Sequence, residues 1–262
     1  ILSPGVVPSD DAARMSAIGS VLARGLSSGA PLPTIEHDAV FGSADADILD
    51  AFAPALIGYF AYFLVFILTG ISFLRERVGG TLERLLATPV MRSEIVAGYA
   101  AGFGLFATLQ VIVIMLSSLG TLSVPALGPL PAFSIGLGIA NAGSPVLAFA
   151  VVLLLALGAV SLGIFISTFA RTELQILQFI PIVIVPQGLL GGIFWPVESL
   201  PDALEVVARA LPLTYAVDGL REVLVKGADL ASPALQLDLG VLAGIAVLLV
   251  VLATLTIRRE VA

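Results

Sequence analysis

Long apolar runs without charge, separated by short charged segments, set the pattern of this sequence. The first such run covers residues 51–74. At a rise of about 1.5 Å per residue, a helix over this run crosses a hydrocarbon core of about 30 Å with some tilt. Four later runs have a similar character. The pattern predicts an all-α membrane protein, a polytopic helical bundle with transmembrane helices at about 51–74, 95–119, 146–170, 174–195 and 237–257.

Small residues and prolines inside two of these runs predict local features. In the second run, Gly98, Ala101 and Gly102 form a small-residue face suited to close helix packing. In the fourth run, Pro181 and Pro186 are expected to kink the helix, because proline lacks the backbone N–H that a helix interior uses.

Three longer connections differ in character. Residues 1–50 are polar and acidic, and Ser9-Asp10-Asp11 predicts the start of a helix within them. Residues 120–145 are uncharged and rich in glycine and proline, which predicts a re-entrant or interfacial connection instead of one straight helix. Residues 196–236 are more polar, and short amphipathic helices are expected there.

The composition supports a membrane protein and narrows its chemistry. Charged residues make up only 12% of the chain, whereas soluble proteins carry about 25%. Hydrophobic residues make up 58%, and the mean hydropathy is +1.09. A net charge of −7 leaves no basic surplus for binding nucleic acid. The absence of cysteine excludes disulfides, thiolate chemistry and cysteine metal sites.

The distribution of Lys and Arg predicts the orientation of the spans. One set of span ends carries seven arginines: Arg75, Arg77, Arg84, Arg92, Arg171, Arg258 and Arg259. The other side has five basic residues spread over two long segments: Arg14, Arg24, Arg209, Arg221 and Lys226. Residues 75–94 are therefore predicted to be cytoplasmic and residues 1–50 external. An external N-terminal segment normally follows an anchor, so we expect a further span before Ile1, and six in all.

The sequence offers few residues for catalysis or for coupling to an ion gradient. Ion-coupled transporters need ionisable side chains at membrane depth. The predicted spans hold none, and Asp238 lies only at the edge of the last one. His37, the single histidine, is interpreted as a solvated surface residue, and Gly79-Gly80-Thr81 lacks the lysine of a phosphate-binding loop. The chain is therefore predicted not to be an enzyme, and energy for transport would come from another chain.

The charged segment 75–94 is the largest surface on the predicted cytoplasmic side. Thr81 is expected to be the N-cap of a helix that runs for two turns before Pro89 stops it. Three leucines share one face of this helix: Leu82, Leu85 and Leu86. The helix lies on the lipid surface, or it is a lever that fits a groove on a partner protein.

Residues 191–224 form a second distinctive region. Trp195 marks the outer membrane interface, and Pro196 breaks the span. Pro201 starts a first helix, Pro212 closes it, and LTYAVDGLREVL forms a second. The apolar face of the first helix carries Leu204, Val207, Ala208 and Leu211. The region is a connector that rests on the outer leaflet, or an external gate over a pathway.

Together these two regions resemble the ABC-2 type transporter permeases. The first, RERVGGTLERLLATPVMRSEIVAG, is similar to the family pattern E-x-x-x-G-T-L-E-x-L-x-x-T-P-x-x-R-x-E-I. The residues that match are Glu76, Gly80, Thr81, Leu82, Glu83, Leu85, Thr88, Pro89, Arg92, Glu94 and Ile95. The second is similar to G-x-x-x-P-x-x-x-x-P-x-x-L followed by L-P-L-T-Y. Its matching residues are Gly192, Pro196, Pro201, Leu204, Leu211, Pro212, Leu213, Thr214 and Tyr215.

The resemblance covers about residues 51–259 and implies a transmembrane subunit of an ATP-binding cassette exporter. Such subunits have six spans and pair as a homodimer or heterodimer. They bind two ATPase subunits through the cytoplasmic loop that corresponds to 75–94. ATP and Mg²⁺ would be bound by the partner, and no cofactor is expected in this chain. The implied location is the bacterial plasma (inner) membrane, in contact with lipid, with residues 1–50 between the first and second spans.

The resemblance also implies which residues act. Those expected to couple to the ATPase are Arg75, Glu76, Gly80, Thr81, Leu82, Glu83, Arg84, Leu85, Pro89, Arg92 and Glu94. Those expected to form an external gate are Gly192, Trp195, Pro196, Pro201, Pro212 and Tyr215. An uncharged pathway suits a hydrophobic or amphipathic cargo such as a drug, a lipid or a lipid-linked glycan. The alternative is a non-transporting membrane sensor or scaffold subunit, in which residues 1–50 bind an external ligand.

Overall fold

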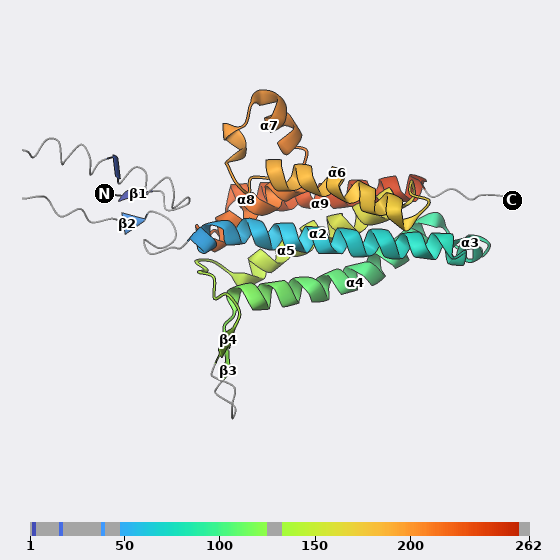
Figure 1. Ribbon diagram of the computed structural model, residues 1–262, viewed down its shortest axis with the longest axis horizontal. Coiled ribbons are helices and arrows are strands. Elements are labelled where there is room, and N and C mark those ends of the chain that lie inside the picture. Colours follow the sequence, from blue (N-terminus) through green and yellow to red (C-terminus); the bar gives the residue numbers. More distant parts are fainter. Residues whose placement is uncertain (1, 4–15, 18–37, 40–47, 125–132, 257–262) are drawn as a thin grey trace, which may run out of the picture.

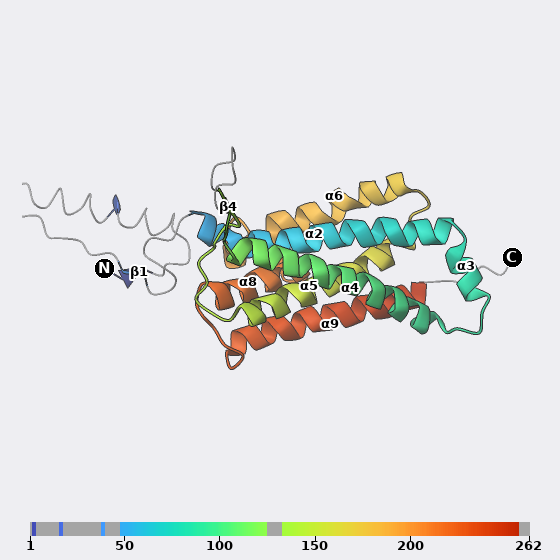
Figure 2. The same ribbon diagram turned by 90° about the horizontal axis from the view of Figure 1, so that it is seen from below.

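Five long helices lie side by side in an elongated bundle (Figures 1 and 2). The computed structural model describes residues 2–3, 16–17, 38–39, 48–124 and 133–256. The long helices are α2 (Ile48–Val78), α4 (Arg92–Leu119), α5 (Pro145–Ser167), α6 (Glu173–Leu190) and α9 (Pro233–Thr256). All five are long and apolar enough to cross a membrane. The predicted all-α, polytopic fold is therefore confirmed.

The centre of the bundle is α5. It is the most apolar of the five helices, and a larger share of it is buried among other helices than of any of the other four. Helices α2, α4 and α9 pack around it, as does the short helix α8 (Pro212–Leu224). At Gly163, a β-carbon would lie only 3.1 Å from the backbone nitrogen of Gly70 on α2. This glycine lets the backbones of α2 and α5 approach closely.

The small-residue face predicted for close packing on α4 contacts no other helix in the described part of the chain. Gly98, Ala101 and Gly102 are exposed, and a β-carbon at either glycine would meet nothing within 4 Å. Instead α4 packs through Gly104, where a β-carbon would lie 3.1 Å from Leu157 on α5. The pattern of small residues predicted that α4 could pack closely, but the opposite face carries the larger buried side chains and faces the core.

Helix α6 continues through both of its prolines. Pro181 and Pro186 lie inside the helix, which ends at Leu190, short of the predicted residue 195. Beyond it, Gly192 has a φ of 81°, a conformation that glycine adopts without strain. The chain turns there towards the short helices at this end of the bundle.

The connection between α4 and α5 contains a β-hairpin that the sequence did not predict. Strand β3 (Leu122–Val124) pairs with β4 (Phe133–Ile135) in antiparallel register. The hairpin projects sideways from one end of the bundle, so its described residues do not re-enter between the helices (Figure 1). The return to the bundle is fixed by backbone hydrogen bonds from Leu137 and Ile139 to carbonyls at the end of α4. The strands have only three residues each, and the glycine and proline residues around them gave no pattern of alternating side chains from which strands could be predicted.

Residues before α2 are described only in part. A short parallel pair joins β1 (Leu2–Ser3) to β2 (Asp38–Ala39). The helix predicted to start at Ser9-Asp10-Asp11 lies outside the described residues, apart from two helical residues at 16–17. His37 also lies outside them.

The segment from 196 to 236 forms the expected short helices, but one of them is deeply buried. Its elements are η1 (Val197–Ser199), α7 (Asp202–Ala208) and α8. Helix α7 projects from the bundle (Figure 1). By contrast, α8 packs against α2, α5 and α9, and its Leu213 and Leu220 are completely buried. The expectation of a connector resting on the outer leaflet is therefore wrong for α8, because its apolar face is covered by helices.

Candidate functional site

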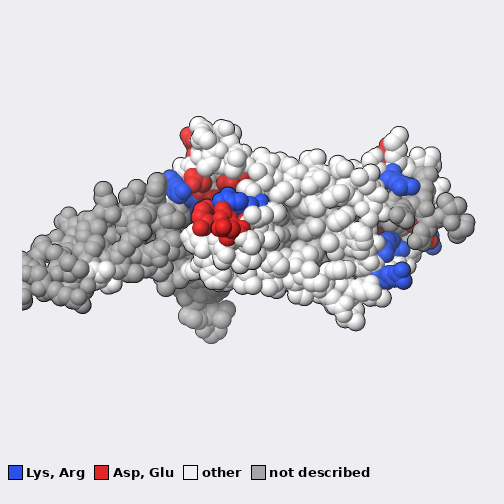
Figure 3. Space-filling view, turned by 90° about the horizontal axis from the view of Figure 1, so that it is seen from above, with Lys and Arg blue, Asp and Glu red and all other residues white. Residues whose placement is uncertain are grey.

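Charged residues gather at the two ends of the bundle, with an uncharged band between them (Figure 3). We call the end that carries α3 (Thr81–Leu86) the α3 end, and the opposite end, where α7 and α8 lie, the α8 end. The uncharged band is the part that suits hydrocarbon. Both groups of predicted site residues therefore lie outside the band, one at each end.

At the α3 end, two glycines turn the chain from α2 into α3. Gly80 is the N-cap of α3, with a φ of 76°. A β-carbon at Gly79 would lie 2.9 Å from the carbonyl oxygen of Arg75. Thr81 is the first residue of the helix and not its N-cap as predicted, because the turn needs a positive φ that glycine supplies more readily than threonine. Pro89 lies in the turn beyond the helix.

The surface of α3 is largely exposed. Leu82 is buried and anchors the helix, whereas Leu85 is 37% exposed. The neighbouring charged side chains, Glu83 and Arg84, are also exposed. The leucine face expected from the sequence is therefore divided between an anchor and an outward-facing residue, and the side chain of Leu86 lies outside the described residues.

Two predicted residues at the start of α4 have different surroundings. The Glu94 carboxylate accepts a hydrogen bond from the backbone N–H of Met91 at 2.8 Å, so it satisfies a free donor at the helix start. Arg92 is the first residue of the helix and is exposed. Met91 itself is 67% exposed. Glu94 thus stabilises the turn, and Arg92 and Met91 extend the exposed surface of α3.

The arginines at the end of α2 face the turn between α5 and α6. Arg75 makes two hydrogen bonds to the Glu173 carboxylate, at 2.8 and 3.2 Å. Arg77 donates to the carbonyl oxygens of Ser167, at 2.8 Å, and Ala170, at 2.5 Å. Thus Arg75, which the sequence placed in the surface for the ATPase, is paired within the chain, and Glu76 between the two arginines is half-buried.

At the α8 end, the predicted gate residues shape the turns between short helices. Pro196 precedes η1, Pro201 precedes α7, and Pro212 is the first residue of α8. These positions use the fixed φ of proline at the start of a helix. Trp195 is half-exposed and contacts Phe194, with ring centroids 5.8 Å apart. Gly192 is buried in the turn after α6.

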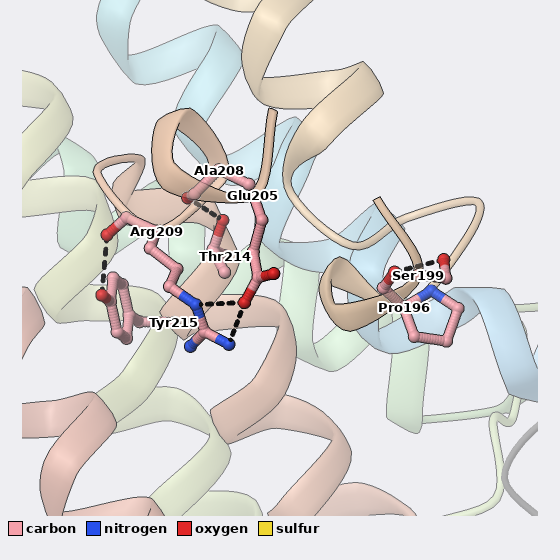
Figure 4. A network of polar contacts seen from close by, with 7 residues as sticks. All are labelled: Pro196, Ser199, Glu205, Ala208, Arg209, Thr214 and Tyr215. Carbon is pink, nitrogen blue, oxygen red and sulfur yellow. Dashed lines mark hydrogen bonds and ion pairs between the residues drawn. The ribbon is translucent and has the colours of Figure 1, made fainter. Parts of the chain in front are cut away.

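Side-chain hydrogen bonds hold α7 against α8 (Figure 4). The Thr214 hydroxyl donates to the Ala208 carbonyl at 2.6 Å, and the Tyr215 hydroxyl donates to the Arg209 carbonyl at 2.7 Å. Arg209 in turn pairs with Glu205 at 2.6 Å on the exposed side. Two adjacent residues of α8 therefore donate hydrogen bonds to carbonyls at the end of α7, which fixes the geometry of the α7–α8 turn.

Sequence reasoning missed Gln187. This side chain is 2% exposed, and its carbonyl oxygen accepts a hydrogen bond from the backbone N–H of Leu213 at 3.1 Å. It therefore joins α6 to the first turn of α8. The sequence did hold a signal, since Gln187 is the lone polar side chain in the apolar second half of α6. A polar side chain buried among apolar ones needs a hydrogen-bond partner, so a contact with another element was to be expected.

Sequence reasoning also missed a group of charged residues on and around α8. Asp238 of α9 is 5% exposed, and it packs against Gly219 of α8. Burial raises the pKa of Asp218 and lowers the pKa of Arg221, since both side chains lose contact with water. Lys226 pairs with Glu222 at 2.5 Å nearby. Ionisable groups thus enter the α8 end of the bundle more deeply than the sequence predicted.

Comparison with known proteins places the chain in a family. A family model for ABC-2 type transporters matches residues 19–225. ABC transporter G family member 20 of Dictyostelium discoideum is 28% identical over 76% of this chain and 25% of its own length. Linearmycin resistance permease protein LnrN of Bacillus subtilis is 27% identical over 67% of this chain and 42% of its own length.

A third relative, inner membrane transport permease YhhJ of Escherichia coli, is 29% identical over 63% of this chain and 40% of its own length. The chain thus spans less than half the length of the curated relatives it matches. The family match includes both regions whose residues suggested the resemblance, and the apolar helices agree with an integral membrane protein. The chain belongs to the ABC-2 type transporter family.

Proposed function

We propose that the chain is the permease subunit of an ABC exporter, which moves a hydrophobic or amphipathic cargo with energy from a separate ATPase. The observation that carries this proposal is the family match across 19–225, which includes the α3 region and its exposed surface. An exporter of this kind needs a surface at which a nucleotide-binding partner transmits its movement. ATP and Mg²⁺ would be bound by that partner, and this chain would supply the membrane pathway.

The partner surface in this proposal is the exposed face of α3 and the turn after it. Glu83 and Arg84 present one charge of each sign, and Leu85 and Met91 present apolar contacts. Such a mixture fits a docking surface, in which apolar side chains provide affinity and charges provide specificity. Under the predicted orientation this surface faces the cytoplasm of a bacterium, where ATP is available.

A second permease subunit would pack on α2 and α6. These helices lie side by side in both views of the bundle (Figures 1 and 2). Phe60, Leu64 and Leu68 form an exposed stripe along α2, and Ile182 and Val185 are exposed on α6. In this proposal the pathway runs between two copies, or between this chain and a related one, and movement of α2 and α6 alternates access to it.

The cargo class follows from the absence of charge on these faces. A charged cargo would lose its hydration against an apolar surface, which costs several kcal/mol or more. A drug, a lipid or a lipid-linked glycan avoids this cost over most of its surface. The Bacillus relative is named a linearmycin resistance permease, which supports export of a drug-like compound. The α7–α8 turn would then be the external gate.

The test is to purify the full-length protein from its own host and to look for a co-purifying ATPase. The complex in vesicles should show ATP-dependent transport of a hydrophobic dye. The variant with Glu83→Arg and Arg84→Glu should lose transport, because both charges on the docking surface are reversed.

Reversing Glu198 and Asp202 at the other end serves as the control and should leave ATPase binding unchanged. Unchanged transport in the α3 variant would refute the role of α3. Absence of any ATPase would favour a sensor or scaffold.

A further inference from the structure

We propose that Arg75, Arg77 and Glu173 form a latch that transmits movement of α3 to α6. This inference rests on the proposed function, since it needs an ATPase that moves α3. It assigns a positioning role to residues that face one another within the chain and that lie behind the partner surface. The latch consists of these three side chains and the carbonyls of Ser167 and Ala170.

The first step is that the α3 end of α2 is held to the α5–α6 turn in two ways. Arg77 donates to two carbonyls at the end of α5 and in the turn, where such groups lack helix partners. A cation is also favoured there by the helix dipole. Below it, Leu74 of α2 packs with Ala170 and Ile176 in a small buried cluster. The turn is therefore fixed to α2, and the two must move together.

The second step is that Arg75 reaches the next helix. Its two hydrogen bonds to Glu173 engage both carboxylate oxygens, so the guanidinium fixes the orientation of the first residue of α6 as well as its position. Both side chains are more than half exposed. An exposed pair stabilises a fold little. Its geometry, across ninety-eight residues of sequence, is better explained by positioning α6 than by stability.

The third step is that α6 is held along α2. It packs mainly on α2, with smaller contacts to α7 and α8 and only slight contact to the central helix α5. Its far end is joined to α8 through Gln187. A displacement of α2 at the α3 end can therefore move α6 as a unit, and α6 reaches the predicted gate. Helix α3 follows α2 after a turn of two glycines, whose backbone N–H groups donate to the carbonyls of Arg75 and Arg77, so a force on α3 reaches the latch.

The test follows α6 directly and does not need the cargo. The chain has no cysteine, so Leu189→Cys, at an exposed position near the far end of α6, labels one site in it with a nitroxide. The full-length protein with its ATPase is placed in nanodiscs, and the accessibility of the label is measured with and without ATP, Mg²⁺ and vanadate. With the unmodified latch, the accessibility of the label should change when ATP is present. With R75E or with E173R, it should not change.

The charge swap separates positioning from a purely structural effect. R75E together with E173R restores the ion pair with its direction reversed, and it should recover the ATP-dependent change. E173D, which keeps the charge, should recover part of it. R171E introduces the same negative charge at the neighbouring exposed arginine and should behave as the unmodified protein. The latch is refuted if R75E and E173R keep the full change, or if the swap remains as impaired as either single variant.

Failure of the proposed function and failure of the latch give different results in this experiment. If no ATPase co-purifies with the unmodified protein, the proposed function fails, and the latch fails with it. If the ATPase co-purifies and hydrolyses ATP, but the label on α6 does not respond, the assignment as a permease subunit stands, and the latch is overturned together with the proposed movement of α6. The ATPase should still co-purify with E173R, because Glu173 lies on α6 and not on α3.

Discussion

The two ends of the bundle use short helices in opposite ways. At the α3 end, a single buried leucine anchors a helix of six residues whose other described side chains are exposed. At the α8 end, a helix of thirteen residues is inserted among α2, α5 and α9. The α3 end presents α3 to the outside, whereas the α8 end buries α8 and leaves only α7 projecting from the bundle. Side chains of α3 are therefore available for a partner, whereas those of α8 maintain the fold.

This difference predicts that substitutions at the two ends separate stability from activity. Burial decides how much free energy a side chain contributes, because lost contacts and a cavity follow its removal. An exposed side chain has few contacts to lose. The comparison can be sharpened by matched variants, taken here from the largest expected effect to the smallest.

The largest effect is expected for Leu220→Ala on α8. Leu220 is completely buried, so the variant should lower the free energy of unfolding by about 2–5 kcal/mol. Leu85→Ala on α3 is the matched control, and it should change this free energy by less than about 0.5 kcal/mol. Thermal unfolding in detergent, followed by size-exclusion chromatography, ranks the two losses as shifts in melting temperature. Equal losses for the two variants would show that α3 is as buried as α8.

A smaller effect is expected for Gln187→Leu on α6. The change leaves the buried N–H of Leu213 without an acceptor, which should cost about 1–3 kcal/mol. Gln178→Leu, on the exposed side of the same helix, is the control and should be near neutral. The same melting measurement applies. If the two variants are equally stable, the hydrogen bond between α6 and α8 contributes nothing.

The hydrogen bonds of the α7–α8 turn should have a smaller effect again. Thr214→Val removes a buried hydroxyl but keeps its shape, and it should cost about 1 kcal/mol. Ser199→Ala removes a similar hydrogen bond at an exposed position, and water replaces it. Limited proteolysis of the turn adds a local readout, since the Thr214 variant should be cut faster there. Equal cutting of both variants would contradict a role for Thr214 in holding the turn.

The sequence predicted the long helices because an apolar run of about 20 residues without charge is typical of a transmembrane helix. It also predicted short helices near Thr81 and Pro212, where glycine and proline mark turns. It could not predict the burial of α8, since an amphipathic pattern identifies an apolar face without showing what covers it. For the same reason the pattern of Gly98 and Gly102 indicated a packing face, while the chain packs through Gly104 and Gly163.

The contacts between helices could not be predicted from one sequence either. Arg75 and Glu173 were both visible as charges at span ends, but their pairing depends on how α2 and α6 pack together. Asp238 appeared to lie at the edge of a span, yet Gly219 on a different helix provides the space that buries it. Local pattern therefore predicted the long helices, and tertiary packing decided which candidate residues face outward and which face the protein.

The smallest effects on stability are expected at two exposed ion pairs, one at each end. Arg75–Glu173 and Arg209–Glu205 have similar closest distances, 2.8 and 2.6 Å. Exposed pairs are screened by water and salt, so neither Glu173→Gln nor Glu205→Gln should shift the melting temperature measurably.

Transport activity should distinguish the two variants. Glu173 joins two helices far apart in sequence, so its neutral variant should impair ATP-dependent transport. Glu205 pairs with a residue one helical turn away, so its variant should not. Because neither variant alters stability, a difference in transport can only reflect what each pair connects, and equal transport would mean that both pairs are ordinary surface contacts.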